Sequence, residues 1–376
     1  MCGIAGFINE IKNFDKNQNI NYLNFLCSQL NHRGPDTKGI WYDVENKIYL
    51  SHTRLSINDL TETGYQPMIN ESNDQVLIFN GEIYNHLKLR ETILKDYNIQ
   101  WKGNSDTETL LKTIQYLGLK KSLNFLEGMF SFCLFDKKLK KVYLARDKFG
   151  EKPMYYGQIK DNFVFGSELK IFNHFPDFQK KISKKALNSY LKFSYVPEPY
   201  SIYENIFKLN AGEYIELNLK ELNLNNLDYS KCLSKIKWFN QVLYSEKKSN
   251  KYNSIIELDK ILNHSVEESL TSDVEVGSFL SGGVDSSLVS AIAQKNSSKK
   301  LKTFSICFEN EDYNEQKYSK LMAEHIQSDH REYFVNNQNM FNYYEKIPEI
   351  YDEPFADSSQ IPTAILSKFA SDNVKV

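Results

Sequence analysis

The pattern of apolar residues changes near residue 255, and this change limits the possible folds more than any other feature of the chain. Up to about residue 180, strand-like apolar runs outnumber helical ones, which predicts an α+β sheet domain over residues 1–180. The strand-like runs cover 4–8, 47–57, 75–84, 129–136, 141–147 and 163–167, and the helical runs cover 22–32, 86–97 and 106–117. Residues 181–254 are less regular, and we interpret them as a connecting region with some strands that ends in a linker.

Residues 255–376 instead alternate between helical and strand-like runs, a pattern typical of βαβ units. We expect helices over 257–270, 284–295, 314–326, 338–350 and 359–371, and strands over 274–280, 301–308 and 331–335, before a short apolar segment at 374–376. This part of the chain is therefore predicted to be an α/β domain with a parallel sheet.

Charge and composition exclude several classes of protein. The chain has 46 Lys and Arg against 48 Asp and Glu, a net charge of −2, so we expect no nucleic acid partner. No window approaches the roughly 18 consecutive apolar residues that span a bilayer, and the N-terminus lacks the basic and apolar regions of a secretory signal. We therefore expect a cytoplasmic protein without a membrane partner. The five cysteines include no Cys-x-x-Cys, which favours reduced thiols over a disulfide framework or a zinc site.

Cys2 is the one cysteine that suggests chemistry. Removal of the initiator Met, which a small second residue permits, would leave Cys2 with both a thiol and a free α-amine. The ordinary pKa values of these groups are about 8.5 and about 8, so the amine can accept the thiol proton near neutral pH. Nucleophile and base would then belong to one residue. Taken alone, however, a Met-Cys start favours an incidental cysteine.

Five further fragments change that interpretation. They are His32-Arg33-Gly34-Pro35-Asp36, His52-Thr53-Arg54-Leu55-Ser56-Ile57, Phe79-Asn80-Gly81-Glu82-Ile83-Tyr84-Asn85, Ser105-Asp106-Thr107-Glu108 and Leu144-Ala145-Arg146-Asp147. Each one alone has a local explanation, such as a turn or a helix cap. Together and in this order they resemble the glutaminase domain of class II glutamine amidotransferases, which are N-terminal-nucleophile (Ntn) enzymes with a layered αββα fold. The resemblance covers about the first 175 residues.

The resemblance implies a role for each matching residue. Cys2 would attack the side-chain amide of glutamine and form a thioester, and the Asn80 side chain and the Gly81 amide would form the oxyanion hole. Arg54 would hold the α-carboxylate of glutamine, a task suited to the bidentate guanidinium, and only five of the 46 basic residues are arginines. The other expected glutamine contacts are Leu55, Ser56, Ile57, Glu82 and Asp106, with Asp106 pairing with the α-ammonium group.

A second motif, Phe279-Leu280-Ser281-Gly282-Gly283-Val284-Asp285-Ser286-Ser287, follows a predicted strand and opens a predicted helix. Backbone amides at such a turn form an anion site, but the loop has neither the Walker A ending nor the dinucleotide glycine pattern. It resembles the PP-loop of ATP pyrophosphatases, in the adenine-nucleotide alpha-hydrolase-like fold. By that resemblance pyrophosphate is bound by Ser281, Gly282, Gly283, Asp285 and Ser286, and adenosine by Leu280 and Ile306. Asp285 would also help to hold Mg²⁺.

A class II glutaminase followed by a PP-loop resembles one family, the glutamine-hydrolysing asparagine synthetases. In that family aspartate reacts with ATP to give β-aspartyl-AMP and pyrophosphate, and ammonia from the glutaminase site travels through a tunnel and displaces AMP. The resemblance thus implies glutamine, aspartate and ATP as substrates, with asparagine, AMP, pyrophosphate and glutamate as products. The segment Tyr351–Ser359 also looks like this family and favours an acceptor site there, although it could be merely a helix cap.

The resemblance breaks after the apolar segment at 374–376. The family continues there with a Ser-Gly-[Asp/Glu]-Gly-x-Asp-Glu segment and a helical region, so we expect the second domain to be incomplete and the chain to be a fragment or an interrupted synthetase. A homodimer, or a second polypeptide that completes the domain, would then be a partner. Two alternatives stay open: an amidotransferase that acts on a sugar acid of surface polysaccharide, and a remnant that retains glutaminase activity or only binds glutamine.

Overall fold

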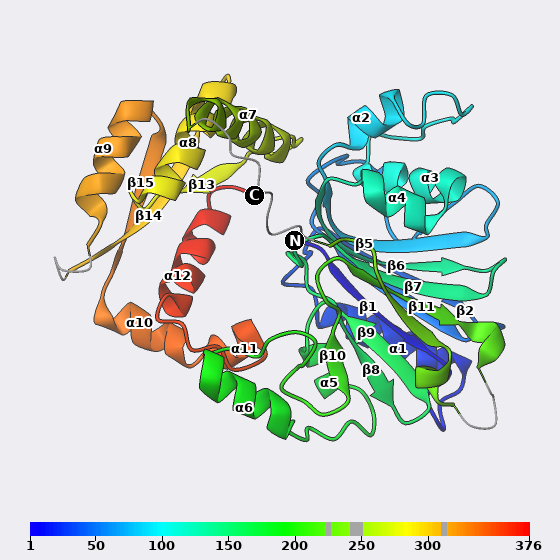
Figure 1. Cartoon of the computed structure of the whole chain (residues 1–376). Coiled ribbons are helices and arrows are strands. Elements are labelled where there is room, and N and C mark those ends of the chain that lie inside the picture. The colour runs from blue at the N-terminus through cyan, green and yellow to red at the C-terminus, as the bar shows by residue number, and fades with distance from the viewer. Residues whose placement is uncertain (223–226, 241–250, 310–313) are drawn as a thin grey trace. The chain divides into compact units, whose positions relative to one another are not determined.

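The computed structural model describes residues 1–222, 227–240, 251–309 and 314–376, and it divides into two units (Figure 1). Unit 1 consists of Met1–Gln241 together with Asp352–Phe355, and unit 2 consists of Val242–Tyr351 and Ala356–Val376. Each unit is built on its own sheets, and the two are described separately below.

Unit 1 contains two six-stranded sheets in which all neighbouring strands are antiparallel. The first has the order β10-β8-β9-β1-β3-β2, with bounds β1 Gly3–Ile8, β2 Thr37–Asp43, β3 Ile48–Arg54, β8 Tyr155–Ile159, β9 Asn162–Gly166 and β10 Ile206–Lys208. The second has the order β12-β11-β7-β6-β5-β4, with bounds β4 Met68–Ile69, β5 Gln75–Ile83, β6 Gly128–Asp136, β7 Lys141–Arg146, β11 Glu213–Asn218 and β12 Leu233–Lys237.

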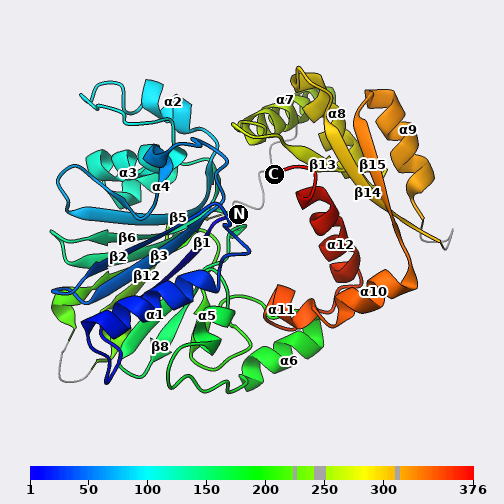
Figure 2. The same ribbon diagram turned by 180° about the vertical axis from the view of Figure 1, so that it is seen from behind.

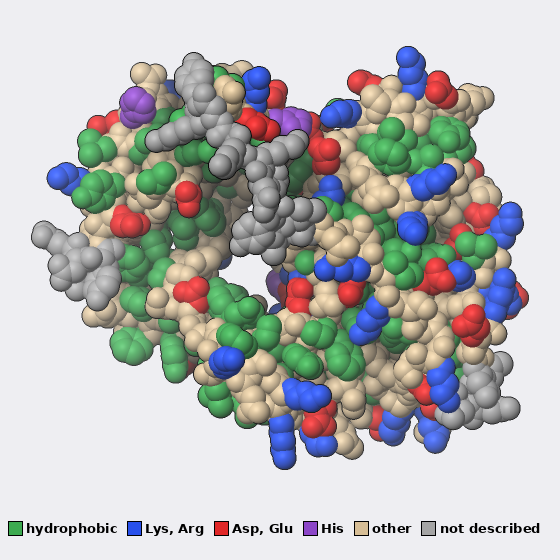
Figure 3. Space-filling model, in the orientation of Figure 1, with side chains coloured by type: hydrophobic (Ala, Val, Ile, Leu, Met, Phe, Trp, Pro, Cys, Tyr) green, Lys and Arg blue, Asp and Glu red, His purple; other side chains and the backbone are tan. Residues whose placement is uncertain are grey.

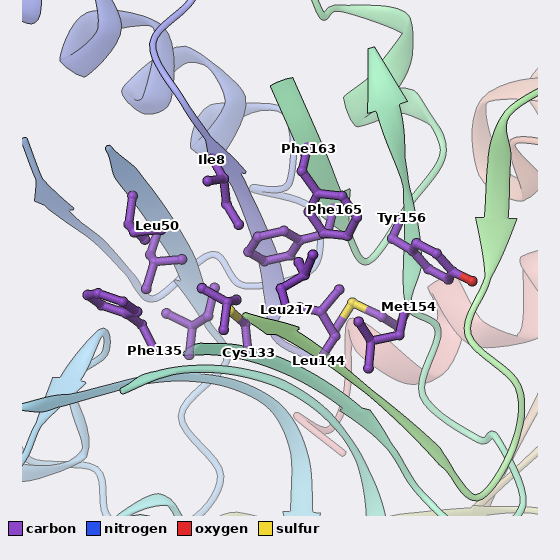
Figure 4. Packing of buried hydrophobic residues seen from close by; sticks show 14 of the residues in the cluster. Ile8, Leu50, Cys133, Phe135, Leu144, Met154, Tyr156, Phe163, Phe165 and Leu217 are labelled. Carbon is purple, nitrogen blue, oxygen red and sulfur yellow. The ribbon is translucent and has the colours of Figure 1, made fainter. Parts of the chain in front are cut away.

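The two sheets face each other across an apolar core (Figure 4). Alternate residues of each strand point into this core, as the period of two requires. Ile8 and Leu50 come from the first sheet, whereas Cys133, Phe135 and Leu144 come from the second. All five are at most 2% exposed, and burial of such side chains is the main term that holds the sheets together.

Helices cover the outer faces of both sheets, which completes an αββα sandwich (Figures 1 and 2). Leu23 and Leu26 of α1 (Lys16–Ser28) pack with Phe7 of the first sheet. On the second sheet, α3 (Asp106–Leu117) and α4 (Leu119–Phe125) pack with apolar side chains of β5 and β6. The shorter helices of unit 1 are α2 His86–Glu91, α5 Lys170–Asn173 and α6 Lys184–Phe193, and its three-residue 3₁₀ helices are Glu62–Gly64, Leu219–Glu221 and Tyr229–Lys231. This architecture confirms the predicted Ntn-type layering.

Several elements differ from the sequence predictions. Helix α1 begins six residues before the expected start, because Asp15 and Gln18 form a capping box. Helix α2 ends at Glu91 instead of reaching residue 97, and β2 and β8 were not predicted. Helix α3 has the predicted bounds, with the Ser105 hydroxyl accepting a hydrogen bond from the Glu108 amide.

The expected connecting region contributes strands to both sheets of unit 1. β10 pairs with β8, and β11 pairs with β7 on one side and β12 on the other. Residues 181–241 therefore belong to unit 1. Asp352–Phe355 belongs to it as well: the Asp352 carboxylate accepts a hydrogen bond from the Lys170 amide at 3.2 Å, and Glu353 pairs with Lys208. Residues 223–226 of this region and residues 241–250 of the expected linker lie outside the described residues.

Unit 2 has a parallel three-stranded sheet in the order β13-β14-β15, with bounds β13 Gly277–Phe279, β14 Lys302–Phe308 and β15 Asp329–Val335. Its helices are α7 Lys251–Ser269, α8 Val284–Asn296, α9 Gln316–Ile326, α10 Asn337–Tyr344, α11 Ile347–Tyr351 and α12 Gln360–Ser371. Phe304 is fully buried against Ala370 and Val374. The Gly277 amide donates to the Val376 carbonyl at 2.8 Å, so the apolar end of the chain lies beside β13. The predicted α/β character is confirmed.

The surface carries acidic and basic side chains in a mixture, visible in Figure 3 and in keeping with the net charge of −2. None of the helices in the described ranges combines the length and apolar character needed to cross a membrane.

Candidate functional site

Cys2 lies at the start of β1, where Gly3 pairs with Thr53 of β3. Arg33 fixes its backbone, because the Arg33 Nε donates to the Cys2 carbonyl at 2.9 Å. The Cys2 Sγ lies 3.4 Å from the Leu55 amide nitrogen, which donates to it. Burial raises the pKa of the Cys2 thiol, although the hydrogen bond from Leu55 acts in the opposite direction. The thiol therefore needs a base to take its proton before it can act as a nucleophile.

Asn80 and Gly81 lie near the end of β5, which pairs with β6. The Asn80 side chain is fully buried, and neither its Nδ2 nor its Oδ1 has a hydrogen-bond partner among the residues that the structure describes. An unpaired buried amide is costly, so its retention points to a ligand that it serves. At Gly81 a Cβ atom would lie 2.1 Å from the Met129 carbonyl oxygen, which leaves room only for glycine.

Arg54, at the end of β3, is 4% exposed. Its guanidinium donates to the backbone carbonyls of Asp59 and Thr61 and lies over the Tyr65 ring, with its carbon 5.6 Å from the ring centroid. A Cβ atom on Gly64 would collide with the guanidinium. Within the described part of the chain, Arg54 forms no ion pair with a carboxylate. This buried positive charge can therefore receive a carboxylate from a ligand.

Two carboxylates, Glu82 on β5 and Asp106 at the start of α3, border the same space. Asp106 accepts hydrogen bonds from the Ile83 amide at 3.0 Å and from the Thr107 amide at 2.8 Å. Burial raises the pKa of Asp106 to about 6. Burial, and then the charge of Asp106, raises the pKa of Glu82 to about 7. A cation bound between Glu82 and Asp106 would stabilise the charged form of both carboxylates, which burial disfavours.

These side chains surround a cavity of about 30 Å³. It is lined by Met1, Cys2, Arg54, Leu55, Ile57, Asn58, Gly64, Gln66, Phe79, Asn80, Gly81, Glu82, Asp106, Thr107 and Lys152. All residues predicted for the glutaminase site line this cavity except Ser56. The Ser56 amide donates to the Asp36 carboxylate at 2.7 Å. Met1 occupies one side of this small cavity. Loss of Met1 would enlarge it next to the Cys2 sulfur.

The raised pKa values predict how stability varies with pH. Glu82 binds its proton more tightly in the folded chain, so its contribution to the free energy of unfolding is present at low pH. That contribution falls as the pH rises from the unfolded value near 4.5 through the folded value near 7. Relative to the wild type, we expect the unfolding temperature of Glu82→Gln to increase by several degrees between pH 5 and pH 8. His52 and the Met1 amine, whose pKa values burial lowers, change stability in the opposite direction, but they do so in both proteins.

Differential scanning calorimetry at each pH measures this dependence. Glu91→Gln, which removes an exposed carboxylate at the end of α2, is the matched control and should follow the wild type. Equal slopes for Glu82→Gln and the wild type would contradict the expectation.

Sequence reasoning missed several residues that build this site. Gln66 accepts a hydrogen bond from the Phe79 amide at 2.6 Å and donates to Thr107 at 3.2 Å, which joins β5 to α3. Arg90 lies over the Trp101 ring and donates to the Ser105 carbonyl, which fixes the turn before Asp106. Lys152 lines the cavity from a turn that no motif included. The one available signal was the scarcity of arginine, which marked Arg90 without giving it a role.

A second cavity, of about 320 Å³, lies in unit 2 at the carboxyl ends of β13 and β14. It is lined by Phe279, Leu280, Ser281, Ser286, Phe304, Ser305, Ile306, Phe308, Glu315, Ser319, Ser359, Pro362, Thr363 and Leu366. In open α/β sheets, ligands bind at this edge.

The predicted phosphate loop forms one wall of that cavity. The Ser281 and Ser286 hydroxyls lie 2.9 Å apart, and the Gly283 amide donates to the Ser281 hydroxyl at 3.2 Å. Gly282 has φ +83° and packs against Tyr318, where a Cβ atom would lie 2.5 Å from the Tyr318 Cβ. Gly283 is the N-cap of α8 and provides no side-chain cap. The first amides of α8 thus remain for an anion.

The structure places the predicted nucleotide residues in two sets. Leu280, Ser281, Ser286 and Ile306 line the cavity, whereas Gly282, Gly283 and Asp285 form the turn beside it. Asp285 is exposed in the first turn of α8. In the described ranges, no group of three or more His, Cys, Asp and Glu side chains could hold a metal ion. A Mg²⁺ ion held by one carboxylate and by nucleotide phosphates fits this arrangement.

Comparison with known proteins covers both units. Residues 1–229 match the family model described as glutamine amidotransferase domain, and residues 257–376 match the one described as asparagine synthase. The "Putative asparagine synthetase (glutamine-hydrolyzing) 2" of Methanocaldococcus jannaschii is 37% identical over the whole chain, which covers 73% of that relative. Asparagine synthetases (glutamine-hydrolyzing) 1 and 2 of Bacillus subtilis are 34% and 33% identical over 100% and 98% of the chain, which spans 57% and 49% of their lengths.

Proposed function

The chain belongs to the family of glutamine-hydrolysing asparagine synthetases, and from this premise we propose that it transfers ammonia from glutamine to aspartate at the expense of ATP. The observation that carries the proposal is the cavity at Cys2. The Cys2 thiol borders this cavity together with the Asn80 amide, which has no hydrogen-bond partner among the described residues, and the buried guanidinium of Arg54. The carboxylates of Glu82 and Asp106, whose pKa values are raised, border it as well.

Each group of an amino acid amide has a complementary group in this cavity. The α-carboxylate would pair with Arg54, which has no ion pair in the described residues, and the α-ammonium with Asp106 and Glu82. This arrangement selects a zwitterion whose side chain reaches Cys2. Glutamine fits this description.

The glutaminase step follows from the chemistry of these groups. Once Met1 has been removed, the Cys2 α-amine takes the thiol proton, and the sulfur attacks the amide carbon of glutamine. The Asn80 Nδ2 and the Gly81 amide donate to the oxygen that becomes negative. The protonated amine then gives its proton to the departing nitrogen, which leaves as ammonia. Water hydrolyses the resulting thioester to glutamate and regenerates the thiol.

The second half of the reaction belongs to unit 2. We assign ATP to the 320 Å³ cavity, with its phosphates at Ser281, Ser286 and the first amides of α8. Mg²⁺ would neutralise charge on the phosphates, and Asp285 would help to hold it. The aspartate side-chain carboxylate attacks the α-phosphorus, which gives β-aspartyl-AMP and pyrophosphate. Ammonia then displaces AMP and gives asparagine.

The test separates the two steps. Chains shown by mass spectrometry to begin at Cys2 are given glutamine alone, and glutamate is measured; ATP, Mg²⁺ and aspartate are then added, and pyrophosphate and asparagine are measured. Glutamate in the first arm and aspartate-dependent pyrophosphate in the second support the proposal. Absence of glutamate would overturn the glutaminase assignment. Pyrophosphate released with glucuronate or galacturonate but not with aspartate would overturn the choice of acceptor.

A further inference from the structure

Lys152 is a buried cation that no motif predicted and that the glutaminase step, as written above, does not use. It is 4% exposed and lines the cavity together with Cys2, Asn80 and Glu82. It comes from the turn that follows β7, far in sequence from the other lining residues. A lysine so deeply buried beside a nucleophile needs a physical reason.

Hydrogen bonds with two buried side chains fix the backbone of the turn that carries Lys152. The Asp147 carboxylate, itself fully buried, accepts hydrogen bonds from the amides of Phe149, Glu151 and Lys152, each at 3.0 Å. The Arg146 Nε donates to the Lys152 carbonyl at 2.7 Å. Asp147 therefore holds the backbone amide of Lys152, and Arg146 holds its backbone carbonyl. Its position is determined by the fold and is not that of a mobile surface lysine.

The ammonium group itself is poorly compensated. Its Nζ donates to the Met1 Sδ at 2.9 Å and to the Met129 Sδ at 2.8 Å, and thioether sulfur is a weak acceptor. Within the described ranges no carboxylate lies within ion-pair distance of it, and the charges of Glu82, Glu151 and Asp147 act on it from further away. Burial lowers the pKa of Lys152. A leucine or methionine would fill this space without that cost, so packing alone does not explain a lysine here.

The ammonium group of Lys152 lies beside Met1 and acts on the amine at the start of the chain. In the structure the terminal amine is that of Met1, and burial lowers its pKa to about 6. Arg33 and Lys152 act in the same direction, whereas the Cys2 thiol and Glu82 favour the protonated amine. Arg54 and Asp106 are the other charged groups that line the cavity. The Arg33 Nε at the Cys2 carbonyl and the Lys152 Nζ at the Met1 sulfur thus bring two cations to the first two residues of the chain.

We propose that Lys152 is a positioning residue for the glutaminase step, and that its buried ammonium group disfavours a proton on the Cys2 α-amine and so keeps that amine available as a base. The inference rests on the proposed function, because it assigns Lys152 to the base of that reaction. Arg33 holds the Cys2 carbonyl and contributes its charge, but it also pairs with Glu168 at 2.8 Å. Lys152 forms no such close ion pair within the described ranges, although the charges of Glu82, Glu151 and Asp147 favour its protonated form.

The pH profile of kcat/KM for glutamine hydrolysis tests this role, measured from pH 5 to pH 9 on chains that begin at Cys2. Each variant is also made in a Glu82→Gln background, so that titration of Glu82, whose pKa the Lys152 charge lowers, does not contribute to the acid limb. In Lys152→Met we expect the acid limb to move to higher pH by about one unit, because the amine then keeps its proton more readily. Lys152→Arg keeps a charge that does not titrate in this range and should keep the wild-type limb. Lys148→Met changes a lysine of the same turn that does not line the cavity, and its profile should match the wild type.

Each result decides between alternatives. An unshifted acid limb in Lys152→Met, whatever its amplitude, overturns the inference, as does a displaced limb in Lys152→Arg. Absence of hydrolysis in the wild type at every pH would instead overturn the proposed function. Circular dichroism shows whether Lys152→Met folds, and Lys152→Gln, which keeps a polar side chain without the charge, provides the same comparison if it does not.

Discussion

Replacing Cys2 with alanine is expected to lower the rate of glutamine hydrolysis by about 10³-fold or more, because the variant lacks the proposed nucleophile. Among the described residues that line the cavity, Met1 is the only other one with a sulfur atom. Alanine is small enough to permit removal of Met1, so the variant would differ from the mature wild type in the sulfur atom alone. Glutamate release, followed with a coupled dehydrogenase, measures the effect, and isothermal titration with glutamine should still detect binding.

Cys27→Ala is the matched control for the loss of a thiol. Cys27 is 1% exposed, does not line the cavity, and its Sγ donates to the His52 carbonyl at 3.5 Å. It should lower the unfolding temperature slightly and leave the hydrolysis rate near that of the wild type. Comparable activity in Cys2→Ala and the wild type would exclude the nucleophile assignment.

Replacing Asn80 with alanine is expected to lower kcat for glutamine hydrolysis by about 10²- to 10³-fold, with KM little changed, because the amide serves the transition state and not the bound substrate. Removing it should cost the folded chain little, because neither polar atom of the amide has a partner to lose. Steady-state kinetics and the unfolding temperature together distinguish this role from a structural one.

Asn162→Ala should show the opposite pattern. Asn162 is also buried, at 5% exposed, but its Nδ2 donates to the carbonyls of Asn9 and Glu10 at 2.9 and 3.3 Å, and it lies outside the cavity. We expect a lower unfolding temperature and an unchanged kcat. A destabilised Asn80→Ala with unaltered kcat would show that Asn80 is structural.

The parts of the site that could be predicted are those in which adjacent residues act together. Asn80, Gly81 and Glu82 are consecutive on one strand, and Ser105 and Asp106 open one helix, so the sequence displays them as units. Lys152 was not predictable in this way. It reaches the cavity because the Asp147 carboxylate folds the turn after β7, and no local pattern indicates where such a turn points.

The same distinction applies to the fold. The bounds of α3 could be predicted because Ser105 caps its start and Gly118 follows its end. Some strands were expected between Ile206 and Lys237, but their bounds could not be predicted. These strands are short and are defined by pairing with β8 and β7, about 50 and 70 residues earlier in the chain. What looked like a connecting region is stabilised by these distant partners.

Under the proposed function, Met1 gives the chain a zymogen-like starting state. It borders the cavity and its sulfur lies against Lys152, so a chain that keeps it has no free cysteine amine and a narrower cavity. The specific activity of a preparation will then be proportional to the fraction of trimmed chains. Synthesis that outpaces aminopeptidase trimming will lower the apparent kcat without altering KM, and active-site titration will count the trimmed molecules.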